Sequence, residues 1–299
     1  MSPGRRPNAS DAAGVERIFI SPADRQKAML DVIGGAQQRL VLSLFRCNEF
    51  SVLDALAAAL DRGVKVEAIL TNRAKGGKKR LRKLWEALEE MGAVVHRYAD
   101  PVVKYHAKYL VADGKTALVA TLNPTRKCFL NTWDFVLTTQ ERNVVRSLST
   151  LFALDAAGER VLPRHRISPR LIIGPEGARA KISALLKSAR HSIRILDHKL
   201  SDPDLVALLR ERRVRGIAVS VIGRQPIPGT VPHGKLLIID EKQALLGSMA
   251  MSALSLDFRR EVSILVETPA AVRALNTYYL DLSARAGESI TVLPGDRAA

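Results

Sequence analysis

An internal repeat constrains this chain more than any other feature, because two copies of one unit are expected to fold alike. The run Phe19-Ile20-Ser21-Pro22 returns as Ile172-Ile173-Gly174-Pro175, 153 positions later, and the same offset relates the turn-and-strand runs at 62–66 and 215–219. Hydrophobic periodicity between these landmarks predicts paired elements: helices over 24–37 and 176–189, strands over 40–45 and 192–196, and helices over 52–61 and 204–213.

The register of the repeat shifts in its second half. His106 and His233 are 127 positions apart, so the first copy holds 26 more residues, and much of this difference fits a helix and a short strand over 75–98. The apolar runs 108–113 and 235–240 align again and end in acidic turns, as buried central strands do.

Helices that alternate with apolar strands predict an α/β fold. We expect two lobes related by a pseudo-two-fold axis, each a mixed or parallel sheet flanked by helices. The expected boundaries are a polar N-terminal tail over 1–16, a first lobe over 17–165 and a second lobe over 166–299, joined by a linker rich in Pro and Arg over 161–170.

Both copies contain the motif His-x-Lys-x4-Asp, followed by a hydroxyl residue 15 positions after the histidine and a carboxylate residue 28 positions after it. Chance does not readily produce this set twice at equivalent places in a repeat. The first copy contributes His106, Lys108, Asp113, Thr121 and Asp134, and the second contributes His233, Lys235, Asp240, Ser248 and Glu261.

These residue types suit phosphoryl chemistry. An imidazole can attack phosphorus or transfer a proton near neutral pH. A lysine two positions along a strand points to the same face as the histidine, where it can neutralise phosphate oxygens. A hydroxyl can donate a further hydrogen bond, and a carboxylate on the far imidazole nitrogen can fix the tautomer. Two such sets provide a nucleophile, an acid and two cations, with no metal and no cofactor required.

The paired motifs resemble those of the phospholipase D superfamily, and the resemblance covers nearly the whole chain. It implies a covalent phosphohistidine intermediate, with His106 and His233 as nucleophile and acid/base. The other roles that it implies are phosphate binding by Lys108, Lys235, Thr121, Asn123 and Ser248, orientation of the histidines by Asp134 and Glu261, and a structural role for Asp113 and Asp240.

One departure from the family pattern distinguishes the two copies. The family often has Gly-Ser-x-Asn after the motif, and the first copy keeps the amide in Ala120-Thr121-Leu122-Asn123. The second copy reads Gly247-Ser248-Met249-Ala250 and lacks it. The fuller set beside His106 favours this histidine as the nucleophile.

The net charge of +16 favours an anionic partner, such as nucleic acid, an anionic membrane or a phosphate-bearing substrate, without choosing among them. Six of the nine residues in 75–83 are basic. This segment is predicted either to begin an ordinary amphipathic helix or to contact an anionic membrane or nucleic acid. The run Asp197-His198-Lys199 follows a strand and can reach the cleft from a loop.

Cys47 and Cys128 indicate reduced thiols, or at most one disulfide. The N-terminus lacks the apolar stretch of a signal peptide, and the chain has no apolar run long enough to cross a bilayer. We therefore expect a cytoplasmic monomer that meets lipid, if at all, from the aqueous side.

The function that we predict is cleavage or transfer of a phosphatidyl group, with a phospholipid or another phosphodiester as substrate. A metal-independent nuclease with the same two histidines is the main alternative; an aromatic content of 5% offers it no obvious stacking platform for bases. The others are a cardiolipin synthase, which the missing N-terminal membrane helices make less favourable, and a non-catalytic lipid- or DNA-binding protein, against which both intact His-Lys pairs argue.

Overall fold

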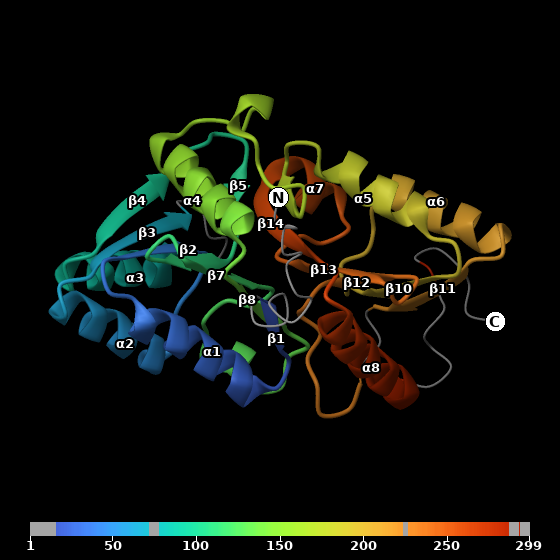
Figure 1. The fold of residues 1–299 in the computed structure, drawn as a ribbon, viewed down its shortest axis with the longest axis horizontal. Coiled ribbons are helices and arrows are strands. Elements are labelled where there is room, and N and C mark those ends of the chain that lie inside the picture. Colours follow the sequence, from blue (N-terminus) through green and yellow to red (C-terminus); the bar gives the residue numbers. More distant parts are fainter. Residues whose placement is uncertain (1–15, 72–77, 224–226, 287–292, 294–299) are drawn as a thin grey trace, which may run out of the picture.

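The protein is described by a computed structural model over residues 16–71, 78–223, 227–286 and 293. The first lobe begins with one strand and continues with alternating helices and strands (Figure 1). Its elements are β1 (Glu16–Phe19), α1 (Pro22–Gly35), β2 (Arg39–Leu44), α2 (Phe50–Asp61), β3 (Lys65–Thr71), α3 (Lys78–Glu90), β4 (Val94–Tyr98), β5 (Lys104–Tyr105), β6 (Tyr109–Ala112), β7 (Thr116–Ala120), the 3-10 turn η2 (Arg126–Phe129), β8 (Val136–Thr139) and α4 (Arg142–Ala157).

The second lobe follows a short 3-10 turn, η3 (Pro163–His165), and repeats the same order without counterparts of α3, β4 and β5 among its described elements. Its elements are β9 (Leu171–Gly174), α5 (Ala178–Ser188), β10 (Ser192–Leu196), α6 (Pro203–Val214), β11 (Ala218–Ile222), β12 (Leu236–Ile239), β13 (Gln243–Gly247), α7 (Ala253–Phe258), β14 (Arg259–Val266) and α8 (Pro269–Ala286).

Each lobe is built on one mixed sheet. The first sheet has the strand order β1-β8-β7-β6-β2-β3-β4, in which β2, β3 and β4 are parallel and the other neighbours are antiparallel. The second sheet has the order β11-β10-β12-β13-β14-β5, with β9 also paired to β14. Strand β5 belongs to the first lobe in sequence, so the chain crosses between the lobes at this point.

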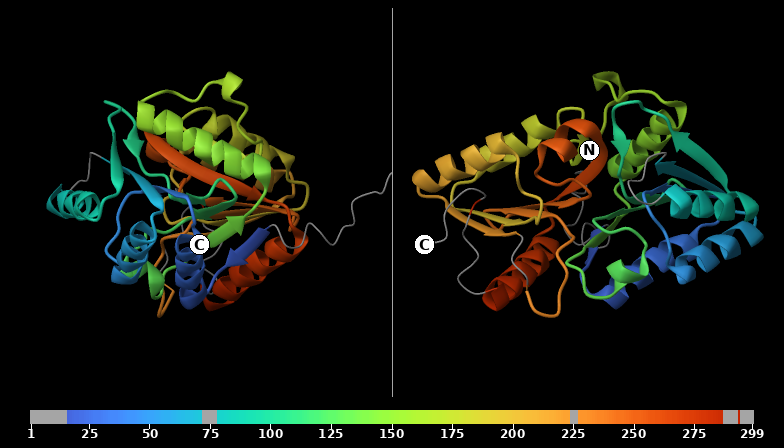
Figure 2. Two further views of the ribbon diagram at one scale, coloured as in Figure 1. Left: turned by 60° about the vertical axis from the view of Figure 1, so that its left-hand side comes forward. Right: turned by 180° about the vertical axis from the view of Figure 1, so that it is seen from behind.

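Helices cover the outer face of each sheet (Figures 1 and 2). The apolar side chains under α1, α2 and α3 form one buried cluster in the first lobe, and those under α5, α6 and α7 form another in the second. The first helix shows how the sequence sets an element: Ser21 accepts a hydrogen bond from the backbone of Asp24, and Pro22 occupies the first turn, where no amide donor is needed.

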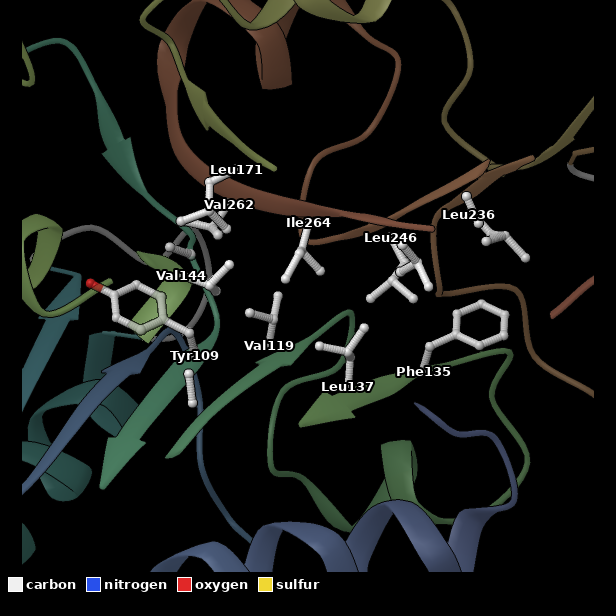
Figure 3. Packing of buried hydrophobic residues seen from close by; sticks show 14 of the residues in the cluster. Tyr109, Val119, Phe135, Leu137, Val144, Leu171, Leu236, Leu246, Val262 and Ile264 are labelled. Carbon is white, nitrogen blue, oxygen red and sulfur yellow. The ribbon is translucent and has the colours of Figure 1, made fainter. Parts of the chain in front are cut away.

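A third buried cluster joins the two lobes. It contains the inner faces of both sheets together with side chains of α4 and α8. Figure 3 shows Val119 and Leu137 of the first lobe packed opposite Leu246 and Ile264 of the second. Because this apolar surface is continuous, the lobes share one core, and their mutual position is fixed by side-chain packing.

The expected α/β fold is confirmed, including the pairing of helices and strands between the two copies. The extra segment predicted over 75–98 forms α3 and β4 at the edge of the first sheet; residues 75–77 lie outside the described residues, as do 1–15 of the predicted tail. Of the helices that the structure describes, none combines the length and apolar character of a bilayer span.

Candidate active site

Each motif histidine follows a short segment that crosses to the opposite lobe. Before His106, Lys104 and Tyr105 of β5 pair in parallel with Arg259 and Arg260 at the start of β14. The backbone N–H of His106 then donates to the carbonyl oxygen of Arg260 at 2.9 Å. The histidine of the first lobe is therefore held against a strand of the second lobe.

The second crossing is the symmetric counterpart of the first. Val231 pairs in parallel with Thr132, two positions before His233, and the N–H of Trp133 donates to the carbonyl of Val231 at 3.2 Å. Gly234 follows, where an added Cβ would lie 1.7 Å from the carbonyl oxygen of Trp133. Only glycine permits the two backbones to approach this closely.

The crossings exchange the two carboxylates between the lobes. Nδ1 of His106 lies 2.9 and 3.0 Å from the two oxygens of Glu261. Nδ1 of His233 lies 2.9 and 3.1 Å from those of Asp134. The sequence predicted that these carboxylates orient the histidines, and the structure brings the four groups together. Repeat alignment alone could not show that each histidine is paired with the carboxylate of the other lobe.

Both carboxylates are fully buried, whereas the side chains of His106 and His233 are 12% and 28% exposed. A proton on Nδ1 directed at the carboxylate leaves Nε2 with a free lone pair. Burial lowers the pKa of both histidines, by more than the facing carboxylate raises it, which favours the neutral ring.

The carboxylates remain ionised despite their burial. Burial alone would raise the pKa of Glu261, but its contacts with His106, Lys108 and Ser248 bring it below the usual value. Burial likewise opposes ionisation of Asp134, and its contacts with His233, Thr121 and Thr132 lower its pKa. Each histidine therefore has a fixed negative partner that can stabilise an imidazolium during reaction.

The two motif lysines occupy equivalent buried positions. Nζ of Lys108 donates to the carbonyl oxygen of His106 at 2.8 Å and lies 3.2 and 3.3 Å from the two ring nitrogens. Nζ of Lys235 donates to the carbonyl oxygen of His233 at 2.6 Å. Burial lowers the pKa of Lys108 to about 7, partly offset by Glu261 and reinforced by Lys235.

Both motif hydroxyls are buried and already hydrogen-bonded within the protein, and their phosphate contact stays a prediction. Thr121 is fully buried and donates to Asp134 at 2.6 Å, and its oxygen accepts from the N–H of Phe135 at 2.9 Å. Ser248 is buried in the same way, against the backbone of Val262 at 3.0 and 3.2 Å. A hydroxyl has one proton, and that of Thr121 is already used.

A further pair of residues beside the carboxylates was missed in the sequence. Ser255 donates to Glu261 at 2.7 Å. Its counterpart at the 127 offset is Cys128, which lies beside Asp134 and His233. Extending the repeat alignment would have identified both positions. Burial raises the pKa of the Cys128 thiol, so it stays protonated and can donate weakly to Asp134.

A metal could use the spacing of three side chains here. One ligand atom from each of Cys128, Asp134 and His233 lies within 4.8 Å of the other two. The facing atoms of Asp134 and His233 are already hydrogen-bonded to each other. A cation could enter only by replacing that bond, so we assign these groups to orientation of the imidazole. Cys47, the other thiol, is also buried and free.

Asn123 is buried near the end of β7, and its side-chain oxygen has no hydrogen-bond partner in the described part of the chain. Its predicted phosphate contact stays a prediction.

Asp113 accepts three backbone N–H bonds, from Gln37, Gln38 and Arg39, at 2.8 to 2.9 Å. Asp240 accepts from 190, 191 and 192 at similar distances, so both motif aspartates join the end of one strand to the start of another.

The rings next to the two histidines differ. Phe45 packs edge-on against His106, with ring centroids 4.9 Å apart. The counterpart of Phe45 at the 153 offset is His198. Burial and the charges of Lys235, Lys199 and His233 lower the pKa of His198 to about 4, so the run Asp197-His198-Lys199 does lie near the site.

Arg25, in the first turn of α1, holds the backbone just before Asp134, the carboxylate of the first lobe. Its side chain is fully buried and donates to the carbonyl oxygen of Thr132 at 2.9 Å, two positions before Asp134. A charged residue at a helix start is usually solvated, so no sequence signal indicated this role.

The geometry agrees with the comparisons. Residues 29–155 match a family model described as "Cardiolipin synthase, PLD-like domain". This matched segment is a phospholipase D-like domain. The resemblance to the superfamily is therefore confirmed, and no curated protein sequence matches the chain.

Solved structures share the fold over both lobes. Polyphosphate kinase from Porphyromonas gingivalis aligns with 89% of this chain at a TM-score of 0.75 and 18% identity, and the alignment covers 46% of that protein. Phosphatidylserine synthase from Haemophilus influenzae Rd KW20 aligns with 92% of this chain and 87% of its own, at a TM-score of 0.71 and 12% identity. At these identities the likeness concerns the fold alone. Nuc from Salmonella typhimurium, a phospholipase D family member, aligns with 48% of this chain and 97% of its own, at a TM-score of 0.44 and 15% identity.

Proposed function

We propose that this phospholipase D-like protein is a phosphodiesterase that cleaves or transfers a phosphatidyl group through a phosphohistidine intermediate. The observation that supports this best is the bond from Nδ1 of each histidine to a buried carboxylate, since it places the proton of the neutral ring on Nδ1 and the lone pair on Nε2. Two lysines beside them can neutralise the phosphate oxygens as charge develops.

In the first step, Nε2 of His106 attacks phosphorus, and the bond from phosphorus to the leaving oxygen breaks. His233 acts as the acid and donates a proton from Nε2 to that oxygen, so the head-group alcohol leaves neutral. His233 must be protonated for this step, and the bound phosphodiester anion favours its imidazolium form. Lys108 and Lys235 hold the non-bridging oxygens.

In the second step, His233 takes a proton from water or an alcohol, whose oxygen attacks phosphorus. The bond between phosphorus and Nε2 of His106 then breaks, and the neutral imidazole is restored. Water as the acceptor gives hydrolysis, and an alcohol gives transfer of the phosphatidyl group. The assignment of His106 as nucleophile is supported by its deeper burial, because a less solvated imidazole is harder to protonate in the free enzyme.

A metal-independent nuclease with the same two histidines is the second candidate, favoured by the net charge of +16. A cardiolipin synthase-like phosphatidyltransferase is a third, favoured by the description of the matching family model. All three candidate functions break and form the same bonds to phosphorus. They differ in the groups that the two ester oxygens of the substrate carry.

Parallel assays of wild type and His106→Ala test the function. The substrates are phosphatidylcholine, phosphatidylglycerol, single-stranded DNA and duplex DNA, each with and without a chelator. We expect head-group release from phospholipid by the wild type only, undiminished by chelator. Cleavage of DNA alone would exclude a phosphatidyl group as the substrate. Full activity of the folded His106→Ala protein would exclude the phosphohistidine mechanism.

We also propose that the basic start of α3 contacts an anionic membrane. Lys78, Lys79, Arg80, Arg82 and Lys83 are all exposed, while Leu84 and Leu88 are buried against the lobe. Cosedimentation with vesicles containing anionic lipid tests this: reversing Lys79, Arg80 and Lys83 to glutamate should weaken binding. The same reversal of three exposed basic residues of the second lobe, Lys187, Arg190 and Arg215, is the control and should have a smaller effect.

A further inference from the structure

The two crossing segments differ in charge although they are equivalent in fold. In the first crossing Lys104 lies in register with Arg259, and in the second Val231 lies in register with Thr132. Like charges directly opposite each other across two strands are destabilising. At this register position the first crossing therefore places two cations together and the second has none.

A third cation joins this pair beside His106, the proposed nucleophile. Nζ of Lys104 lies 5.1 Å from the ring centroid of Phe45, and Cζ of Arg46 lies 5.3 Å from it. The same ring packs against His106 at 4.9 Å and has Nζ of Lys108 at 5.9 Å. Arg46 and Lys104 are thus held around one ring that also contacts the reacting histidine.

These outer cations are poorly neutralised. The nearest carboxylate oxygen to Arg259 is that of Glu261 at 3.9 Å, and Glu261 is already bonded to His106 and Ser255. Within the described ranges, Nε of Arg259 is buried without a hydrogen-bond partner, and neither Lys104 nor Arg46 forms an ion pair. Burial, and then the charges of Arg259 and Arg46, lower the pKa of Lys104.

The site carries more positive charge than one phosphodiester can neutralise. The buried lysines Lys108 and Lys235 balance the two ionised carboxylates, and a reacting phosphodiester brings a single negative charge. The three outer cations therefore exceed what one phosphodiester can neutralise. Charge-assisted bonds from lysine and arginine are the usual means of holding a phosphate group.

We propose that Lys104 and Arg259, together with Arg46, form a second anion subsite that binds another phosphate group of the substrate, next to the reacting phosphodiester. This rests on the proposed function for the identity of the reacting site. The second phosphate can come from a diphosphate linkage or from the next position in a nucleotide chain. Either would place the more anionic side of the substrate over Lys104 and away from Val231.

Calorimetric binding at fixed ionic strength tests the subsite without turnover, so a failure of the proposed reaction would not affect the result. The probes are inorganic orthophosphate, inorganic pyrophosphate and thymidine 3′,5′-bisphosphate. We expect at least one two-phosphate probe to bind the wild type about ten-fold more tightly than orthophosphate, as for an added charge-assisted contact. Pyrophosphate as the tighter probe indicates the diphosphate source, and the bisphosphate indicates the nucleotide chain.

Three variants test whether the tighter binding of a two-phosphate probe comes from this subsite. Lys104→Gln and Arg46→Gln, each confirmed as folded by circular dichroism, should remove most of the ten-fold preference while changing the affinity for orthophosphate little. Lys115→Gln, an exposed lysine in the turn after β6, is the matched control and should keep the preference. Equal affinity of the wild type for all three probes, or a preference that persists in Lys104→Gln, would overturn the proposal.

Discussion

At the scale of single residues, the proposed roles of His106 and His233 depend on which ring nitrogen of each carries the proton. The bonds from Nδ1 to Glu261 and Asp134 define a tautomer with Nε2 free. The hydroxyls of Thr121 and Ser255 then orient those carboxylates. Each reactive atom is thus positioned by a chain of two contacts.

The exchange of carboxylates predicts which histidine responds to which substitution. Glu261→Gln should change the imidazole resonances and pKa of His106 and leave those of His233 nearly unchanged, while Asp134→Asn should do the reverse. Loss of the correct tautomer typically lowers kcat by roughly 10³- to 10⁴-fold. Nitrogen-15 NMR of labelled histidine checks the pairing, and a response of His233 to Glu261→Gln would contradict it.

The pKa of Lys108 predicts the alkaline limb of the pH profile. Its pKa is about 7, and only the ammonium form can neutralise phosphate, so kcat/KM should fall as pH rises through 7. A diester with a good leaving group, such as bis(p-nitrophenyl) phosphate, is the suitable substrate because it makes the acid on His233 dispensable. A rate that keeps rising from pH 7 to pH 9 would be incompatible with this role of Lys108.

At the scale of elements, the two crossing segments determine how the site is assembled. Residues 104–106 and 231–233 each leave their own lobe to pair with the other, and Gly234 lies between the second histidine and its lysine. The symmetric position in the first copy is Ala107, so the second crossing is the tighter one.

We therefore predict that Gly234→Ala disrupts the second crossing. The added Cβ would meet the carbonyl oxygen of Trp133 at 1.7 Å, which forces the backbone on both sides of the site to move. Activity should fall by about 100-fold or more, as for a 1 Å misplacement of catalytic groups. Gly35→Ala, at a position where nothing lies within 4 Å of the added atom, is the control and should retain activity.

The repeat made most of the elements predictable, because hydrophobic periodicity and the 153 offset reinforce each other. The same alignment could not predict the crossings, since β5 has two residues and Val231 forms an isolated bridge. Such short pairings leave no periodic pattern. The bond from Thr121 to Asp134 could not be predicted for a related reason, since spacing along a chain does not show where a hydroxyl proton points.

At the scale of the whole molecule, the two lobes share the buried cluster between their sheets (Figure 3). Neither lobe can complete a catalytic pair alone, because each histidine needs a carboxylate from the other. All these groups belong to one chain, and the site is therefore complete in a monomer.

The shared core predicts a single cooperative unfolding transition. Leu246→Ala, in the cluster between the sheets, should lower the free energy of unfolding by about 2–5 kcal/mol and shift the whole transition. Denaturant unfolding followed by fluorescence of Trp85 and Trp133, both in the first lobe, and by far-UV circular dichroism of the whole chain checks this. Two separate transitions, one for each lobe, would show that the lobes fold independently.

Intact-protein mass spectrometry of the His233→Ala variant tests most directly whether phosphorus becomes bonded to His106. A substrate with a good leaving group needs no acid for attack, whereas removal of His233 slows the release step. We expect a covalent adduct that accumulates on His106 in His233→Ala and is absent from His106→Ala. An adduct on His233 in the His106→Ala protein would reverse the two roles, and the absence of any adduct during turnover would contradict the phosphohistidine mechanism.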